Sequence, residues 1–121
     1  MSLTVHEASV PVVIKALTAL SGVLDKGAAH AAAKGTDEAN YLTMRLVPDM
    51  PPLSAQVGIA CDIPRRGLLR MAEQEPAAME DKEASFAGLK ARIAETIAVL
   101  QGITPESLEG SETRIITLPT P

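Results

Sequence analysis

The sequence predicts an all-α fold, an up-and-down helical bundle of three long helices with short linking helices and one β-like strand at the C-terminus. Two observations lead to this prediction. Apolar residues recur at spacings of three and four along three separate segments, which is the period of an amphipathic helix. The 121 residues are 46% hydrophobic but include one Phe, one Tyr and no Trp. An aliphatic, Ala-rich core of this kind suits closely packed helices joined by modest loops.

The first long helix is expected to begin near Ser9, because Ser is a good N-cap and Pro11 is tolerated in a first turn. It is expected to end at Gly35, a residue suited to the left-handed position after a helix. Thr36 would then cap a short second helix. The apolar face of the first helix consists of Val10, Val13, Ile14, Leu17, Leu20 and Leu24.

The second long helix follows the proline-rich junction RLVPDMPPL, and Asp49 is expected to cap it. Pro64 lies inside its apolar pattern and should kink the helix rather than end it. The third long helix is expected to begin at Glu80 or Asp81 and to end at Gly102. Its apolar face consists of Phe86, Leu89, Ile93, Ile97 and Leu100.

The last stretch, residues 113–118, reads TRIITL and is followed by Pro119. Its β-branched residues predict a strand. One strand is not stable alone, so this one requires a partner, and no other segment of the chain reads as a strand.

Charge and cysteine content limit the functional classes. Eleven basic residues stand against fifteen acidic ones, with no basic run, so we expect no nucleic-acid partner. No secretory signal is visible, and the apolar stretch VPVVIKALTALSGVL is short and contains Lys15, so we expect no membrane association and a cytoplasmic location. The single Cys61 predicts a small core residue, with a reactive thiol beside Arg65 as the alternative.

Several segments together resemble a known family. KGAAHAAAKG, RLVPDMPPLSAQVGIACD, FAGLKARIAETIAVL and LEGSETRIITLP, in this order, are similar to an uncharacterised bacterial family of domains of unknown function in the DinB/YfiT-like four-helix-bundle superfamily. The resemblance runs from about Val5 to Leu118, and the block from Pro48 to Val57 is its most specific part. It implies that residues 1–121 form a single DinB-like helical-bundle domain that is short at its C-terminus relative to the family.

The resemblance also implies what would follow the strand. In that family the strand is the first arm of a hairpin, and a fourth long helix containing His completes the bundle. Many members of the superfamily hold a divalent metal with three His, and some are thiol-dependent S-transferases. Here His6 and His30 are too far apart in sequence to form a metal-binding pair, and a closed site needs three or four ligands. We therefore expect no metal and no cofactor.

Five residues are candidates for a ligand-binding site: His30, Asp49, Gln56, Tyr41 and Arg45. Each also has a purely structural interpretation. His30 would be a surface or interface residue, Asp49 an N-cap, and Gln56 a hydrogen-bonding bridge between helices. Tyr41 and Arg45 are four residues apart, which predicts a packed pair on one helix face or at the mouth of a pocket.

Three functions are compatible with these features. The first is a self-associating protein whose partner is a second copy in a homodimer. Three amphipathic helices leave an apolar groove and the strand leaves an unpaired edge, and a symmetric dimer would cover both. The second is a metal-dependent transferase or hydrolase whose site is completed between chains. The third is a module that binds a small molecule in the groove. The sequence alone does not settle whether the protein is an enzyme.

Overall fold

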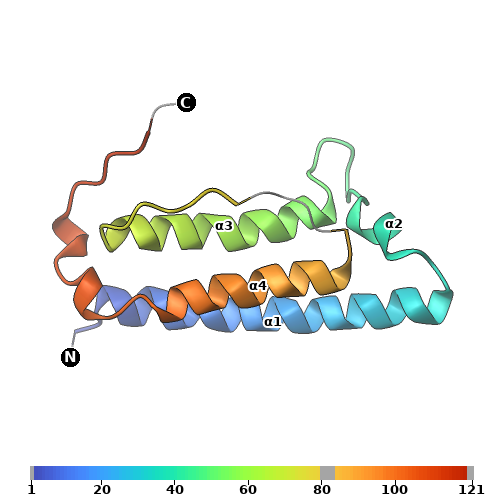
Figure 1. The fold of residues 1–121 in the computed structure, drawn as a ribbon, viewed down its shortest axis with the longest axis horizontal. Helices are drawn as coiled ribbons and strands as arrows, with labels where there is room; N and C mark the ends of the chain where they lie inside the picture. Colours follow the sequence, from blue (N-terminus) through green and yellow to red (C-terminus); the bar gives the residue numbers. More distant parts are fainter. Residues whose placement is uncertain (1, 80–83, 120–121) are drawn as a thin grey trace.

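Three long helices form the body of the computed structural model, which describes residues 2–79 and 84–119 (Figure 1). They are α1 (Val5–Lys34), α3 (Leu53–Met71) and α4 (Phe86–Gln101). The short helix α2 (Glu38–Leu42) links α1 to α3, and two 3-10 turns, η1 (Glu106–Leu108) and η2 (Ser111–Thr113), follow α4. The predicted all-α fold of three long helices with short linking helices is confirmed.

The two ends of the bundle show in which direction each helix runs. At one end, the backbone N–H of Phe86, where α4 begins, donates to Glu38 Oε1 of α2 at 2.8 Å. At the other end, His6 Nε2 of α1 lies 3.1 Å from the carbonyl oxygen of Ile103, just after α4. Helices α3 and α4 are therefore parallel, and α1 is antiparallel to both (Figure 1).

The parallel pair corrects the predicted up-and-down order, which holds for α1 and α3 but not for α3 and α4. After Met71 the chain turns and runs back along α3 before α4 begins (Figure 1). The guanidinium of Arg65 holds this return segment, since its Nη2 donates to the carbonyl oxygen of Ala77 at 2.8 Å. A connection long enough to recross the bundle allows two successive helices to point the same way.

The two ends of α1 follow from local sequence. Thr4 Oγ1 accepts a hydrogen bond from the backbone N–H of Glu7 at 3.1 Å, and Glu7 Oε2 accepts one from the backbone N–H of Thr4 at 3.3 Å. This reciprocal capping box starts the helix at Val5, so the predicted start near Ser9 is wrong. The predicted end is confirmed, because Gly35 adopts φ 64°, the left-handed conformation that glycine tolerates.

The caps of the other helices also differ from the prediction. Asp37 rather than Thr36 caps α2, with its Oδ1 accepting from the backbone N–H of Ala39 at 3.1 Å. The N-cap of α3 is Pro52, without a side-chain hydrogen bond, so the prediction that Asp49 caps this helix is wrong. Asp49 lies exposed in the preceding loop, too far along the chain to reach the first turn of α3.

Helix α4 begins at Phe86, and Ser85 Oγ accepts from the backbone N–H of Gly88 at 3.0 Å. The predicted start at Glu80 or Asp81 lies outside the described residues. The predicted end at Gly102 is confirmed.

The core lies where α4 meets both α1 and α3, and α1 and α3 contact each other much less. The α4 side chains of Leu89, Ile93 and Leu100 are almost fully buried in it. Pro64 lies within α3, which continues to Met71 as predicted. Cys61 is 1% exposed, which confirms the core interpretation and leaves its thiol inaccessible as a nucleophile. The buried apolar residues contributed by α1 are Val10, Leu17, Leu24 and Ala31.

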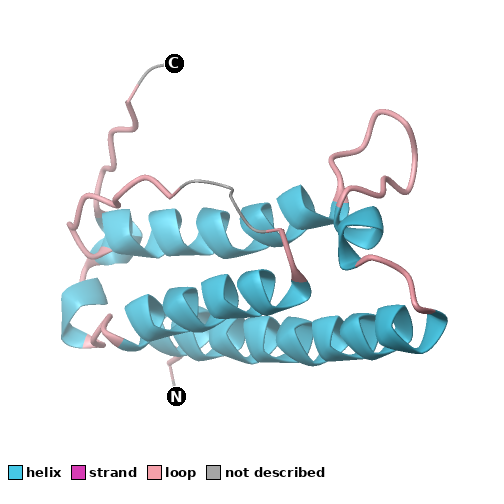
Figure 2. Cartoon of the chain, turned by 45° about the vertical axis from the view of Figure 1, so that its right-hand side comes forward, coloured by secondary structure: helices cyan, strands magenta, loops and turns pink. Residues whose placement is uncertain are grey.

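The predicted C-terminal strand is wrong for the part of the chain that the structure describes (Figure 2). Thr113 ends η2, and residues 114–119 are extended without forming a ladder with any described segment. Ile115 is 92% exposed and Leu118 is 59% exposed, so this segment gains little from burial. A β-branched composition does not make a strand by itself, because a strand also needs a neighbour.

By length and composition alone, α1 could cross a membrane. This is weak evidence, because the core helix of a soluble protein or an N-terminal signal sequence satisfies the same criteria. The expected cytoplasmic location and the expected absence of a membrane partner therefore stay predictions.

Candidate functional site

A largely apolar cavity of about 730 Å³ lies at the end of the bundle where α1, α2, the start of α3 and the start of α4 converge. The loop between α2 and α3, residues 43–52, forms its outer wall. Most of its lining is aliphatic, thioether or aromatic. The lining residues are Leu20, Val23, Leu24, Gly27, Tyr41, Met44, Arg45, Leu46, Met50, Pro51, Leu53, Gln56 and Phe86.

Phe86 forms the inner end of this cavity, and three contacts position it. Its backbone N–H donates to the Glu38 carboxylate, so α2 and α4 are joined at the cavity. Its ring packs on the backbone of α1 at Gly27, where the missing side chain leaves room for it. Ser85 caps the helix that Phe86 begins. The wall at this point is therefore built by three helices that are distant in sequence.

Hydrogen bonds within loop 43–52 shape the outer wall. The backbone N–H of Leu53 donates to the carbonyl oxygen of Met44 at 3.0 Å, which draws the two ends of the loop together. Arg45 Nη1 donates to the carbonyl oxygen of Met50 at 2.7 Å. Gln56 Nε2 donates to the carbonyl oxygen of Pro51 at 3.3 Å. Two side chains that line the cavity therefore also hold the loop.

The structure brings three of the five predicted site residues to this cavity: Tyr41, Arg45 and Gln56. His30 lies behind Tyr41, with the two rings edge to face and their centroids 5.8 Å apart. Asp49 is exposed in the loop and does not line the cavity. That any of the five binds a ligand stays a prediction.

Sequence reasoning missed most of the apolar wall. Met44, Leu46 and Met50 belong to the proline-rich junction, and their accumulation in a loop was a signal that could have been used. Met44 is 57% exposed and Leu46 is 85% exposed, and both lie beside Met50 at the same cavity. The contributions of α1 and of Phe86 could not be found by inspection, because they depend on how the helices pack.

Within residues 2–79 and 84–119, Arg45 is the one residue with a full charge among those that line the cavity. Its hydrogen bond to Met50 occupies one of its five N–H donors. Arg66, by contrast, lies 3.6 Å from Asp62 Oδ2. Arg45 has no carboxylate within ion-pair distance in the described part of the chain, so its charge is not neutralised locally.

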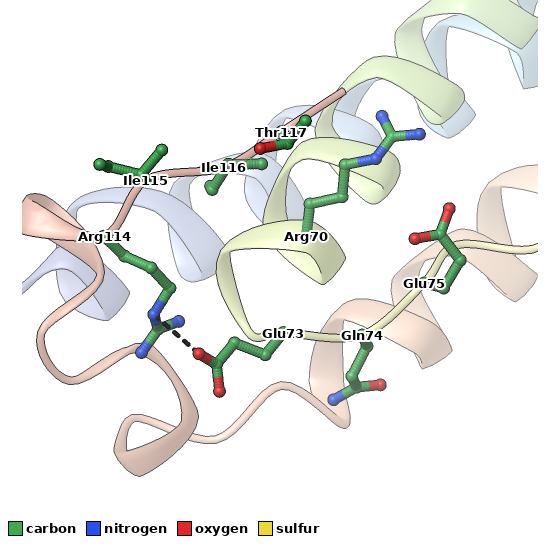
Figure 3. A pocket seen from close by; sticks show the side chains of 8 residues that line it. All are labelled: Arg70, Glu73, Gln74, Glu75, Arg114, Ile115, Ile116 and Thr117. Atoms are coloured by element: carbon green, nitrogen blue, oxygen red, sulfur yellow. Dashed lines mark ion pairs between the residues drawn. The ribbon is translucent and has the colours of Figure 1, made fainter. Parts of the chain in front are cut away.

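A second, polar cavity of about 330 Å³ lies between the end of α3 and the C-terminal segment (Figure 3). Arg114 reaches across it, with its Nε 3.3 Å from Glu73 Oε1. Arg114 also donates to the carbonyl oxygens of Met71 and, at 3.1 Å, Glu109. These contacts attach the C-terminal segment to the end of α3.

The described residues do not fit the three-His metal site of the superfamily. Nowhere in residues 2–79 and 84–119 do three or more His, Cys, Asp or Glu side chains gather as metal ligands. His6 and His30 lie near opposite ends of α1, roughly 36 Å apart at the rise of an α-helix. His6 instead contacts the Ile103 carbonyl. No catalytic step through a metal follows from these residues.

Comparisons with known proteins agree with this fold. A family model described as a domain of unknown function, DUF1993, matches residues 5–121. The crystal structure of a DinB family member protein from Shewanella denitrificans superposes with a TM-score of 0.88 at 31% sequence identity, covering 94% of this chain. The chain spans 65% of the length of that solved relative. A comparison with curated proteins found no match.

Proposed function

The chain belongs to the DUF1993 family of DinB-like domains, and we propose that it is a binding protein whose ligand occupies the apolar cavity between α1, α2, α3 and loop 43–52. The observation that supports this most directly is the lining itself, in which apolar side chains surround a few polar groups at one place. This is the usual composition of a small-molecule site.

The size of the cavity supports the same proposal. About 730 Å³ falls within the range of roughly 300–1,000 Å³ that is typical of small-molecule sites. Each square ångström of apolar surface removed from water contributes about 25 cal/mol. A ligand that covered the exposed side chains of Met44 and Leu46 would therefore gain free energy from the loop as well as from the helices.

Two substitutions on α1 test this proposal as a matched pair. Val23 is 61% exposed and lines the cavity, whereas Val12 is 58% exposed and does not. Eleven residues are about three turns, so both lie on the same face of α1. We expect Val23→Glu to weaken binding of an environment-sensitive apolar fluorophore about tenfold or more, because it places a charge at the cavity wall. Val12→Glu should leave the affinity unchanged.

The proposal is wrong if the wild-type protein shows no saturable fluorescence change with the fluorophore and no thermal shift with apolar compounds. It is also wrong if the two Glu variants behave alike. Circular dichroism of both variants would confirm that each remains helical.

Self-association is a second candidate function, and the exposed surface favours it. The accessible surface is 7885 Å², whereas a compact monomer of 12.7 kDa is expected to expose roughly 6,200 Å². The excess of roughly 1,700 Å² is about twice the area of roughly 800 Å² that each partner buries in a standard protein interface. Ile63 of α3 is 69% exposed and Ile59 is 43% exposed, and Ile63 lines a hollow together with Ile116 and Leu118 of the C-terminal segment.

We therefore propose a homodimer that covers the exposed face of α3 around Ile59 and Ile63. Light scattering after size exclusion, at two protein concentrations, should give twice the chain mass. Ile63→Glu should shift the protein to monomer, whereas Thr18→Glu, at an exposed position of α1 away from the Val12 face, should not. A wild-type monomer at micromolar concentration would rule out the dimer and leave the ligand proposal intact.

The third possibility, a metal-dependent transferase or hydrolase, requires ligands from another chain to join His30 or Asp49. Metal analysis of untagged protein tests it directly. A content of zinc, nickel and manganese well below one metal ion per site in the purified protein would exclude the metal-dependent enzyme.

A further inference from the structure

We propose that the ligand of the apolar cavity is an amphiphile with a carboxylate head group, and that Arg45 and Tyr41 bind this head group at the cavity wall. This inference rests on the proposed function, because it specifies the chemistry of the ligand at the same site. The class we infer is a free monocarboxylate carrying an unbranched apolar chain.

Charge complementarity supports the anionic head group. Arg45 is the one fully charged residue among the described residues that line the cavity. The chain as a whole has a net charge of −4, and Arg65, Arg66 and Arg114 each lie beside a carboxylate. Arg65 is 2.7 Å from Asp62, and Arg114 is 3.3 Å from Glu73. Within the described part of the chain, Arg45 has only the Met50 carbonyl as a polar partner, so most of its donors remain available to a ligand.

The position of Tyr41 supports a second contact. Tyr41 lies four residues before Arg45, and both side chains line the same cavity. The edge-to-face contact with His30 holds its ring, and its hydroxyl makes no hydrogen bond with any described residue. A phenolic O–H and a guanidinium together can donate to both oxygens of a carboxylate. A hydroxyl or a cation in the ligand would not use the charge of Arg45.

The remaining lining supports an unbranched apolar chain. Met44 and Met50 are unbranched and polarizable, so they adapt to the shape of a flexible ligand. Leu20, Leu24 and Phe86 provide an apolar interior with no charged group. The head group therefore has one cation available at the wall, and the chain has an apolar volume beside it.

Isothermal titration with three ligands of equal chain length tests the inference: decanoate, decan-1-ol and decyltrimethylammonium. We expect the wild-type protein to bind decanoate about tenfold more tightly than decanol, because charge-assisted hydrogen bonds add to chain burial. Decyltrimethylammonium should bind more weakly than either. The advantage of decanoate should shrink as NaCl is raised, since screening weakens the ion pair but not burial.

Variants at Arg45 identify the residue responsible. Arg45→Gln should reduce decanoate affinity about tenfold and leave decanol affinity unchanged. Arg45→Lys should retain the preference for decanoate, because it keeps the charge and a donor. Arg70→Gln is the matched control, since Arg70 lines the polar cavity at the other end of α3 and should leave both affinities unchanged. Decanol also reports on the loop, because damage to the Arg45–Met50 bond would lower its affinity as well.

The outcomes separate this inference from the proposed function. Equal binding of decanoate and decanol to the wild type overturns the carboxylate head group and retains the apolar site. Failure of all three ligands overturns both. A third outcome is that Arg45→Gln loses affinity for both decanoate and decanol, whereas Arg45→Lys keeps both affinities. This result overturns the head-group role and assigns Arg45 to the loop alone.

Discussion

Gly27 of α1 lies against the ring of Phe86 so closely that a Cβ atom at position 27 would be 3.0 Å from both Cε1 and Cζ of that ring. Phe86 is 3% exposed and forms the inner end of the apolar cavity. The packing of α1 against α4 is therefore coupled to the shape of the candidate site through this one glycine.

Gly27→Ala should lower the affinity for an apolar ligand. The new methyl would push the Phe86 ring toward the cavity, which is the neighbouring free space, and reduce the volume available. Helix propensity gains about 0.5–1 kcal/mol from Gly to Ala, whereas overpacking costs about 1–3 kcal/mol. We expect a net destabilisation of about 1 kcal/mol, measured by urea unfolding, and weaker binding of the apolar fluorophore.

Gly22→Ala is the matched control on the same helix. A Cβ at position 22 would meet nothing within 4 Å. This variant should gain about 0.5–1 kcal/mol from propensity and bind the fluorophore normally. Equal effects of the two substitutions on binding would contradict the coupling between Gly27 and the cavity.

The bond between Glu38 and the backbone N–H of Phe86 should contribute to stability and to the cavity together. Glu38→Ala leaves a helix N-terminal donor without its charged acceptor, which costs about 1–2 kcal/mol. Glu38→Gln keeps an acceptor and loses the charge, so it should cost about half as much. Chemical denaturation orders the three proteins. An unchanged midpoint for Glu38→Ala would show that water replaces the carboxylate without loss.

The ends of α1 show what sequence reasoning could and could not predict. Gly35 was correctly predicted, because a glycine after the last apolar repeat is a strong local signal. The observed start of α1 could also be predicted from the sequence, since Thr4 and Glu7 have the spacing of a capping box. The prediction that the helix begins near Ser9 depends on Pro11, which follows two residues later. Pro11 is nevertheless tolerated within α1, on the exposed face of the helix.

The direction in which α4 runs could not be predicted from the local sequence. The course of residues 72–79 back along α3 depends on the tertiary bond from Arg65 to the Ala77 carbonyl. The set of residues that line the cavity also depends on tertiary packing. Tyr41 and Arg45 both line the cavity, but α2 ends at Leu42, so Arg45 lies in loop 43–52 and the predicted pair on one helix face is wrong. Val23, Gly27 and Phe86 join them only because three helices meet there.

Arg65 should be much more important for stability than its neighbour Arg66, although both contact the carboxylate of Asp62. Arg65 is 3% exposed and also bonds the Ala77 carbonyl, whereas the Arg66 side chain is 47% exposed. Arg65→Ala should cost about 2–3 kcal/mol, because it removes buried hydrogen bonds and packing. Arg66→Ala should change the free energy of unfolding by less than about 0.5 kcal/mol.

Arg65→Met separates the two causes, since it keeps most of the volume and loses the hydrogen bonds. We expect an intermediate cost of about 1–2 kcal/mol and faster amide hydrogen exchange in residues 72–79. Slow exchange in that segment with Met at position 65 would show that packing alone holds the return connection.

Replacing Glu73 by Gly should stabilise the protein. Glu73 has φ 61° and ends α3 in a Schellman-type turn, with the backbone N–H of Gln74 donating to the Leu69 carbonyl at 2.8 Å. A residue with a Cβ is strained in this conformation by about 1–2 kcal/mol relative to Gly. The substitution also removes the ion pair with Arg114, but the Glu73 side chain is 72% exposed, so that pair contributes less than about 1 kcal/mol. We therefore expect a net gain of about 0.5–1 kcal/mol in the free energy of unfolding, measured in urea.

Glu73→Gln, which keeps the strain and loses the charge, should stay within about 0.5 kcal/mol of the wild type. Gln74→Gly should be destabilising, because a glycine there gains freedom in the unfolded chain and relieves no strain. A lower unfolding midpoint for Glu73→Gly than for Glu73→Gln would mean that the strain is smaller than the conformational entropy of the added glycine.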